Sequence, residues 1–420
     1  MNKYIIFASS WLMYLLPLAL LTGPFLPDII ICLIGISVTF LIIKEKKYTY
    51  IKNKYSTFFL LFCLYLIISS FFAESIIISL ESSLFYFRFG LFAICVWYLI
   101  DNNKKFIKNF SIFLLVTFAF ALLDGYYQYY NDIGIFGFEY PGVRLSLLLD
   151  DRAILGGYLS RLFPLLLAVL IYSYDLKKSN ILLIMLILIL TDILIFISGE
   201  RTALGLLFLS TVFIIVFLSK YKKIRFFTFL ISLVLMTLIM LLNPSIKERN
   251  IDQTINEITG GKQLTAGGYK DILLFSKIHQ SYIVSGWKMF VDKPLLGQGP
   301  KMWRVLCDDT RFNQIENKYK CSTHPHNSYA QLLAETGILG LVFIIILYFK
   351  LLKLIFVHCL LLIRKQEYLL SDFQICLIAC FMVTLWPFIP SQNFFNNWIN
   401  IIYYLPIGFF LHSLHKKEMT

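Results

Sequence analysis

The residues of this sequence best suited to chemistry are three histidines that lie between residues 243 and 330. His279 stands alone, whereas His324 and His326 belong to the run His-Pro-His-Asn that ends at Asn327. Proline stops a helix and asparagine often caps the next one, so a helix is predicted to begin directly after His326. A neutral imidazole, with a usual pKa of about 6.5, can take a proton from a hydroxyl group near neutral pH. His326 is therefore the candidate general base, and the alternative is an ordinary polar residue at an interface.

Two cysteines lie in the same region, and their position suggests a disulfide. Cys307 and Cys321 are in polar sequence, whereas the other cysteines lie in apolar runs, where a thiol behaves as a small hydrophobic group. Outside the cytoplasm such a pair oxidises. The sequence thus predicts a Cys307–Cys321 disulfide just before the paired histidines, with two free thiols as the alternative.

A metal site and a nucleotide site are the competing interpretations of this region. His324, His326, Asp308 and Asp309 are of types that bind zinc, but a His-x-His pair alone is a weak signal. The Gly-x-Gly at residues 297–299 lacks the flanking strand of a dinucleotide site. We expect neither a metal ion nor a cofactor.

The elements that position this region are apolar runs. Hydrophobic residues make up 58% of the chain and charged residues 15%, against about 25% charged residues in soluble domains. A run of about 20 apolar residues crosses a membrane as a helix. The sequence predicts an all-α polytopic membrane protein with about twelve transmembrane helices, near residues 4–22, 26–43, 57–72, 83–100, 109–125, 153–173, 181–197, 202–219, 226–242, 331–362, 370–389 and 397–413.

The formal net charge of +13 comes mainly from short clusters of lysine and arginine between alternate apolar runs. Such clusters favour the cytoplasmic side, so both termini are expected in the cytoplasm. Membrane spans separate the clusters, which argues against a nucleic-acid-binding face.

This topology divides the chain into residues 1–242 with nine spans, a large outer loop at residues 243–330, and residues 331–420 with three spans and a tail. The loop has more lysine and arginine than acidic residues. A solvated surface, anionic lipid headgroups or a diphosphate substrate would each explain that excess.

Two motifs of the loop resemble those of the O-antigen ligase and O-antigen polymerase superfamily. His326 and Asn327, followed by Gly337 and Gly340, match the family hallmark, and residues 293–300 (KPLLGQGP) resemble the family segment that precedes it.

The resemblance extends to the membrane part of the chain, over roughly residues 120–400. Residues 198–201 (SGER) resemble the family's Ser-x-Arg turn, and residues 144–164 resemble the segment that follows an earlier periplasmic loop.

This resemblance implies a GT-C-like glycosyltransferase of the bacterial inner membrane, with its active site facing the periplasm. Members transfer a glycan from an undecaprenyl diphosphate carrier to a hydroxyl group, without a metal ion. In the ligases the acceptor is a sugar of the lipid A core, and in the polymerases it is another carrier-linked glycan. Membrane lipid is a further expected partner, and nucleic acid is not.

The resemblance also implies site residues. Arg201 is the first candidate for holding the carrier diphosphate, because a guanidinium group binds phosphate oxygens in pairs. The sequence departs from the family where a second arginine precedes the amphipathic segment, and His279, Lys277, Lys288 or Arg304 could replace it. The complete assignment is His326 as catalytic residue; Arg144, Arg201, His279, Arg304, His324 and Asn327 as substrate-binding residues; and Pro294, Gly297, Gly299, Gly337 and Gly340 as structural-motif residues.

Three functions are compatible with the sequence. The histidine motif favours a ligase over a polymerase. A polysaccharide or lipid transporter is the alternative from another class, although coupled transporters usually carry more charge near the middle of the membrane.

Overall fold

The computed structural model describes the chain except residues 139–143, 147–151, 175–177, 260–275, 316–320, 365–368 and 420. The predicted all-α class is confirmed, since the described residues form helices and no strand. The membrane part contains α1 (Asn2–Ala19), η1 (Leu20–Thr22), α2 (Phe25–Lys44), η2 (Tyr48–Tyr50), α3 (Lys54–Ser70), α4 (Ile76–Ser83), α5 (Phe87–Asn102), α6 (Phe106–Asn131), α7 (Leu155–Ser173), α8 (Lys178–Ile197), α9 (Arg201–Phe217), α10 (Lys222–Leu242), α15 (Ser328–Ile363), α16 (Asp372–Leu385) and α17 (Asn397–Met419).

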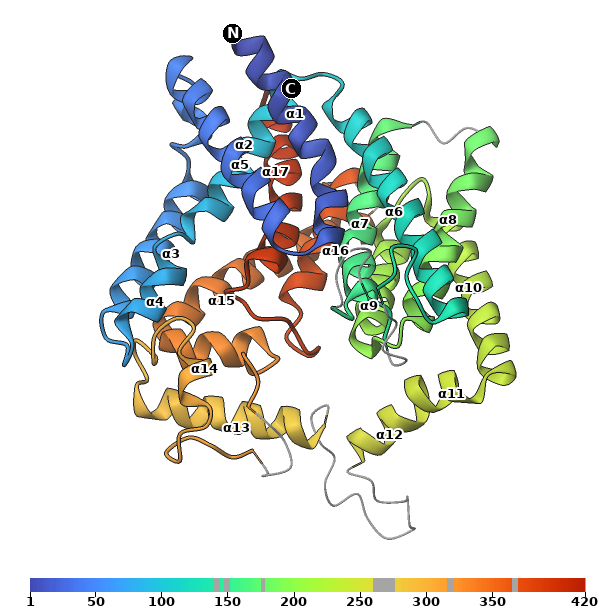
Figure 1. The fold of residues 1–420 in the computed structure, drawn as a ribbon. Helices are drawn as coiled ribbons and strands as arrows, with labels where there is room; N and C mark the ends of the chain where they lie inside the picture. The colour runs from blue at the N-terminus through green and yellow to red at the C-terminus, as the bar shows by residue number, and fades with distance from the viewer. Residues whose placement is uncertain are drawn as a thin grey trace.

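The described residues of the region between α10 and α15 form short helices joined by turns and irregular segments. It contains α11 (Pro244–Lys247), a short π-helical turn η3 (Glu248–Asp252), α12 (Gln253–Ile258), α13 (Lys277–Asp292) and α14 (Trp303–Leu306). Both termini lie at one end of the helix bundle, and α12, α13 and α14 lie at the other (Figure 1). We call these the terminal end and the loop end.

The polytopic membrane character predicted from the sequence is confirmed. In the described residues, seven helical segments are long and apolar enough to cross a membrane: Asn2–Thr22, Phe25–Lys44, Ile76–Asn102, Phe106–Asn131, Leu155–Ser173, Lys222–Leu242 and Ser328–Ile363. The remaining predicted spans also lie on helices, namely α3, α8, α9, α16 and α17, of which the first four have shorter apolar stretches.

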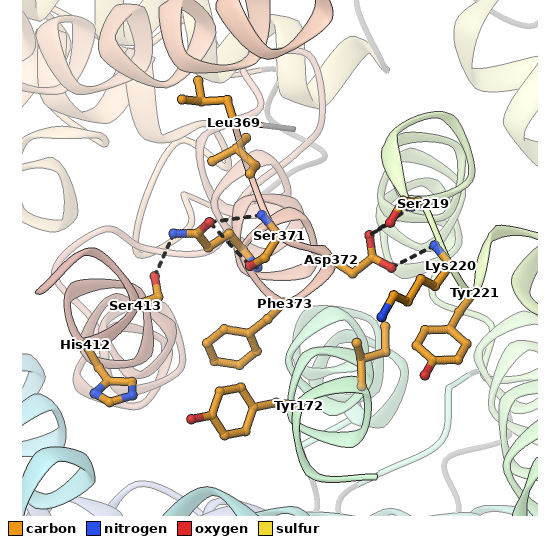
Figure 2. A pocket seen from close by; sticks show the side chains of 13 residues that line it. Tyr172, Ser219, Lys220, Tyr221, Leu369, Ser371, Asp372, Phe373, His412 and Ser413 are labelled. Carbon is orange, nitrogen blue, oxygen red and sulfur yellow. Dashed lines mark hydrogen bonds between the residues drawn. The ribbon is translucent and has the colours of Figure 1, made fainter. Parts of the chain in front are cut away.

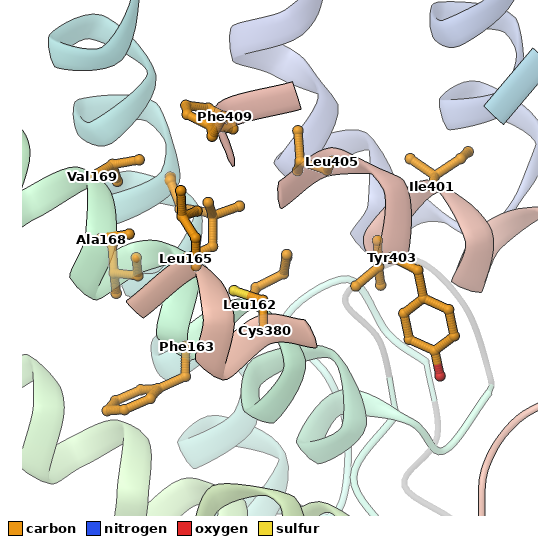
Figure 3. Packing of buried hydrophobic residues seen from close by; sticks show 14 of the residues in the cluster. Leu162, Phe163, Leu165, Ala168, Val169, Cys380, Ile401, Tyr403, Leu405 and Phe409 are labelled. Atoms are coloured by element: carbon orange, nitrogen blue, oxygen red, sulfur yellow. The ribbon is translucent and has the colours of Figure 1, made fainter. Parts of the chain in front are cut away.

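Helix α7 forms the centre of the bundle. Every residue from Leu155 to Leu170 is buried, and the helix packs against α6, α9 and α16. A helix that is apolar all round can be enclosed by other helices in this way. Figure 3 shows Leu162 and Leu165 close to Cys380 of α16, with Leu405 of α17 in the same cluster.

A fully buried ion pair next to α7 joins three helices. Both guanidinium NH groups of Arg225 on α10 donate to the carboxylate of Asp192 on α8, at 2.8 and 3.0 Å. The same guanidinium donates to Thr211 of α9 and stacks over the ring of Phe163. Two opposite charges inside an apolar bundle must satisfy each other, so this pair fixes the relative positions of α8, α9 and α10.

The loop end has a small hydrophobic core of its own, formed by Tyr282, Met289, Met302, Trp303 and Leu306 among others. The predicted Cys307–Cys321 disulfide is confirmed at the edge of this core, with 6.0 Å between the two Cα atoms. It ties the segment that leads to the histidines onto α14.

Candidate active site

Helix α15 begins as the sequence predicts. The side-chain oxygen of Asn327 accepts hydrogen bonds from the backbone N–H groups of Tyr329 and Ala330, each at 3.0 Å. Its amide group donates to the carbonyl oxygen of Pro387 at 2.9 Å. Asn327 therefore caps α15, and its side-chain oxygen and amide group are both engaged within the protein, whereas the sequence predicts a role in substrate binding.

The two glycine-containing motifs meet at a kink in α15. Gly337 breaks the helix with φ 60° and ψ −167°, and Gly297 also has a positive φ, 69°. The backbone N–H of Ile338 donates to the carbonyl of Pro294 at 2.9 Å. The N–H groups of Gln298 and Gly299 donate to the carbonyls exposed by the kink. The loop segment thus satisfies backbone groups that the broken helix leaves open.

Two further glycines allow close packing around this junction. A Cβ atom on Gly299 would lie 2.5 Å from the Cβ of Ala73, and one on Gly340 would lie 2.9 Å from the ring of Tyr65. The hydroxyl of Tyr65 donates to the carbonyl of Thr336 in the kink. Gly340 therefore lets α15 lie against α3, and Gly299 lets the loop lie against the segment that follows α3.

A buried carboxylate that sequence reasoning missed connects the same segments. Glu335 is fully buried, and its carboxylate accepts from the backbone N–H of Trp303 at 2.8 Å and from the amide of Gln331 at 2.9 Å. Gln331 also donates to the side chain of Asn393 at 2.8 Å. These hydrogen bonds join α14 and the segment between α16 and α17 to the first turns of α15.

His326 lies directly before this capped helix, in a strained backbone conformation. Its φ is 53°, in the left-handed region that residues other than glycine rarely adopt. Its carbonyl oxygen accepts a hydrogen bond from the backbone N–H of Ser391 at 2.8 Å. The neighbouring segment therefore holds the strained residue in place, as is common at functional sites.

Three aromatic rings surround the imidazole of His326. The ring centroids of His324, His279 and Tyr282 lie 4.2, 5.5 and 5.7 Å from that of His326. His324 is hydrogen-bonded through both ring nitrogens, to Thr323 and to the carbonyl of Ser391. In the part of the chain that the structure describes, no hydrogen bond reaches the ring nitrogens of His326. They remain available to a ligand.

The surroundings keep these imidazoles neutral. Burial and the neighbouring His324, His279 and Arg144 lower the pKa of His326 to about 3. Burial likewise lowers the pKa of His324 to about 4 and lowers that of His279. At neutral pH His326 therefore presents a lone pair that can accept a hydrogen bond from a hydroxyl group.

Positive charge lies close to the histidines. Arg201 is the first residue of α9, and its guanidinium binds the carboxylate of Glu257 on α12. The charges of Arg201 and Arg144 both lower the pKa of His279, and that of Arg304 on α14 lowers the pKa of His324. Arg144, Arg201 and Arg304 thus each act electrostatically on at least one of the three histidines.

The turn between α8 and α9 anchors two of these arginines. Gly199 has a φ of 71°, and the carbonyl of Ser198 accepts a hydrogen bond from the backbone N–H of Leu145 at 3.2 Å. This bond holds Arg144, the residue before Leu145, beside the turn that carries Arg201.

Glu200 in this turn is a second carboxylate that the sequence analysis did not single out. It accepts a hydrogen bond from the backbone N–H of Gly157, at the start of α7, at 3.1 Å. Burial raises its pKa to about 7, although that hydrogen bond, Arg161 and Arg144 act in the opposite direction.

Among the described residues, no three His, Cys, Asp or Glu side chains are grouped closely enough to hold a metal ion. A cavity of about 660 Å³ lies toward the terminal end, between the ends of α7, α16 and α17 and the α9–α10 turn. Figure 2 shows Asp372 there, hydrogen-bonded to Ser219 and Lys220. Its described lining contains none of the residues assigned to the candidate active site.

Fold and site together define a class: a polytopic helical membrane protein with a neutral histidine and several arginines gathered beside a large loop. Residues 183–345 match the family model described as O-antigen ligase, and the match includes Arg201, the loop and the histidine motif. This match covers less than half of the chain and supports its similarity to the O-antigen ligase and polymerase superfamily, whose members are glycan-transferring enzymes with lipid-linked glycan substrates. No curated protein matches the chain.

Proposed function

We propose that this protein is an O-antigen ligase. In this proposal it transfers a glycan from undecaprenyl diphosphate to a sugar hydroxyl of the lipid A core, at the periplasmic face of the bacterial inner membrane. The main support is His326, a neutral imidazole with ring nitrogens available to a ligand. Arg144 acts electrostatically on this ring, and Arg201 acts on the adjacent His279.

The proposed reaction is a direct displacement. The oxygen of the acceptor hydroxyl attacks the anomeric carbon, and the bond from that carbon to the diphosphate oxygen breaks. The diphosphate leaves with the electron pair, His326 takes the hydroxyl proton, and the configuration at the anomeric carbon is inverted. Arg201 and Arg144 stabilise the charge that develops on the leaving diphosphate. The proposal thus assigns this task to guanidinium groups, not to a metal ion.

Donor binding would also make His326 a stronger base. The charge of Arg144 is among the causes that lower the pKa of His326 to about 3. A bound diphosphate adds negative charge nearby, which favours the protonated imidazole and raises the pKa. Proton acceptance is thereby coupled to the presence of the donor.

The test is transfer by the purified protein in lipid nanodiscs, with an undecaprenyl diphosphate glycan and with or without lipid A-core. Glycan attached to lipid A-core is the expected product. Lengthened carrier-linked glycan in the absence of lipid A-core would instead identify a polymerase. Movement of carrier across liposome membranes without any new glycosidic bond would identify a transporter.

The His326→Ala variant tests the catalytic assignment. Loss of a general base typically lowers the rate about 10²- to 10⁴-fold, so transfer is expected to fall by that factor while the protein remains folded. His415→Ala is the matched control, because His415 lies near Asp101 at the terminal end and is 35% exposed. Full activity of His326→Ala would rule out the assigned role.

A further inference from the structure

Arg201 holds an internal carboxylate at the position assigned to the donor diphosphate. One of its terminal NH groups donates to both carboxylate oxygens of Glu257, each at 2.9 Å, and the other lies 3.4 Å from the hydroxyl of Thr254. Only 24% of the Arg201 side chain is exposed. Both terminal NH groups of this guanidinium are therefore in contact with side chains of α12.

Other contacts position the segment that carries Glu257 next to Arg201. Asn250 donates to the carbonyl of Phe196 at the end of α8, at 3.3 Å. The Nε of Arg249 lies 3.4 Å from the carbonyl of Gly199 in the following turn. The segment from η3 to α12 thus lies along the α8–α9 turn, and its helical register brings Thr254 and Glu257 to Arg201.

A carboxylate and a phosphate compete for the same N–H donors of a guanidinium group. Each presents two oxygens to its N–H donors, so the two cannot occupy the same donors at once. Phosphate carries at least as much charge, and the carrier has two phosphates. The Glu257 side chain is 42% exposed, so it can rotate its carboxylate toward the solvent when another anion binds Arg201.

The surrounding charges favour this exchange. Glu257 raises the pKa of His279, whereas Arg201 and Arg144 lower it, so one carboxylate and two guanidinium groups act on the same imidazole. An anion with more charge than Glu257 would be held more strongly among them.

We propose that Glu257 is the internal occupant of the donor-phosphate position on Arg201, and that it sets the affinity for the donor by competing with it. This inference rests on the proposed function, because it takes the carrier diphosphate as the anion that replaces Glu257. Glu257 is in this view an affinity-determining residue, not a catalytic one.

The experiment measures binding of undecaprenyl diphosphate to the full-length protein in nanodiscs, without any acceptor. If Glu257 occupies Arg201 for about nine-tenths of the time, Glu257→Gln should bind about tenfold more tightly than the unmodified protein. Glu248→Gln is the matched control, because Glu248 is an exposed carboxylate of the same segment and should leave binding unchanged. In transfer assays Glu257→Gln should lower the donor KM and leave kcat unchanged.

A double variant separates competition from a structural effect. In an Arg201→Gln background, Glu257→Gln should no longer change binding, because the guanidinium for which the two anions compete has gone. Unchanged or weaker binding by Glu257→Gln, or an effect that persists without Arg201, would overturn the inference. Binding that follows this pattern without glycan transfer would remove the proposed function but leave the competition at Arg201 established.

Discussion

Gly297 and Gly337 lie backbone to backbone, 40 positions apart in the sequence. A Cβ atom on Gly297 would lie 2.5 Å from the backbone nitrogen of Gly337, and one on Gly337 would lie 2.7 Å from that of Gly297. This contact places the loop segment against the kink of α15. It explains why both motifs need glycine at these positions.

Replacement of Gly337 by alanine should therefore destabilise the loop end. The new methyl group would meet backbone atoms that cannot move separately, and the positive φ adds strain, so a loss of about 2–4 kcal/mol is expected. Thermal unfolding in nanodiscs would measure it. Gly137→Ala is a matched control, because Gly137 has a φ of 84° but no atom within 4 Å of its Cβ position. Equal losses in the two variants would show that strain alone, not the contact with Gly297, matters.

Removal of the Cys307–Cys321 disulfide should also lower stability. The cross-link spans a sequence separation of 14, for which a loss of about 3 kcal/mol is typical. The Cys307→Ser/Cys321→Ser variant should melt at a lower temperature than the oxidised protein, and reductant should have no further effect on it. Cys32→Ser serves as control, since Cys32 is an exposed free thiol. A melting temperature that does not respond to reductant in the unmodified protein would contradict this prediction.

Acid should weaken the folded state through the paired histidines. The pKa values of His326 and His324 in the folded protein, about 3 and about 4, lie below the usual value of about 6.5. At pH values between the folded and the usual pKa, the unfolded chain binds more protons than the folded protein. The contribution of both residues to the free energy of unfolding is therefore complete above about pH 6.5 and decreases as the pH falls.

Melting temperatures between about pH 7 and pH 5 would measure this effect. The decrease should be smaller in His324→Asn/His326→Asn, in which asparagine also tolerates the left-handed backbone of residue 326. His415→Asn is the control at the terminal end. Parallel curves for the double variant and the unmodified protein would argue against the pKa shifts.

Disruption of the buried ion pair between Arg225 and Asp192 should destabilise the membrane part. Arg225→Met leaves Asp192 charged and without its partner in an apolar bundle, which should cost about 3–5 kcal/mol. Adding Asp192→Leu should recover much of that loss, because no uncompensated charge then remains. Denaturation of the single and double variants in the same detergent would measure both steps. The hydroxyl of Ser232 also donates to Asp192, at 2.9 Å, and a double variant that is no more stable than Arg225→Met would mean that this hydrogen bond dominates.

The sequence alone determined the features that depend on local pattern. Apolar runs of membrane-spanning length predicted the helices, since each must satisfy its backbone hydrogen bonds internally. Pro325 and Asn327 predicted the start of α15, because a ring without N–H ends one helix and a side-chain oxygen caps the next. The position of Cys307 and Cys321 outside the apolar runs predicted their disulfide.

Only the tertiary structure decided which remote residues meet. Three contacts join separate elements, and no local sequence pattern specifies their partners. They are the contacts of Glu257 with Arg201, of Glu335 with Trp303 and of Arg225 with Asp192. Each depends on helix packing and register, because a shift of one residue turns a side chain by about 100° around its helix. The neutral state of His326 has the same origin, since burial and the charges of residues far along the chain lower its pKa.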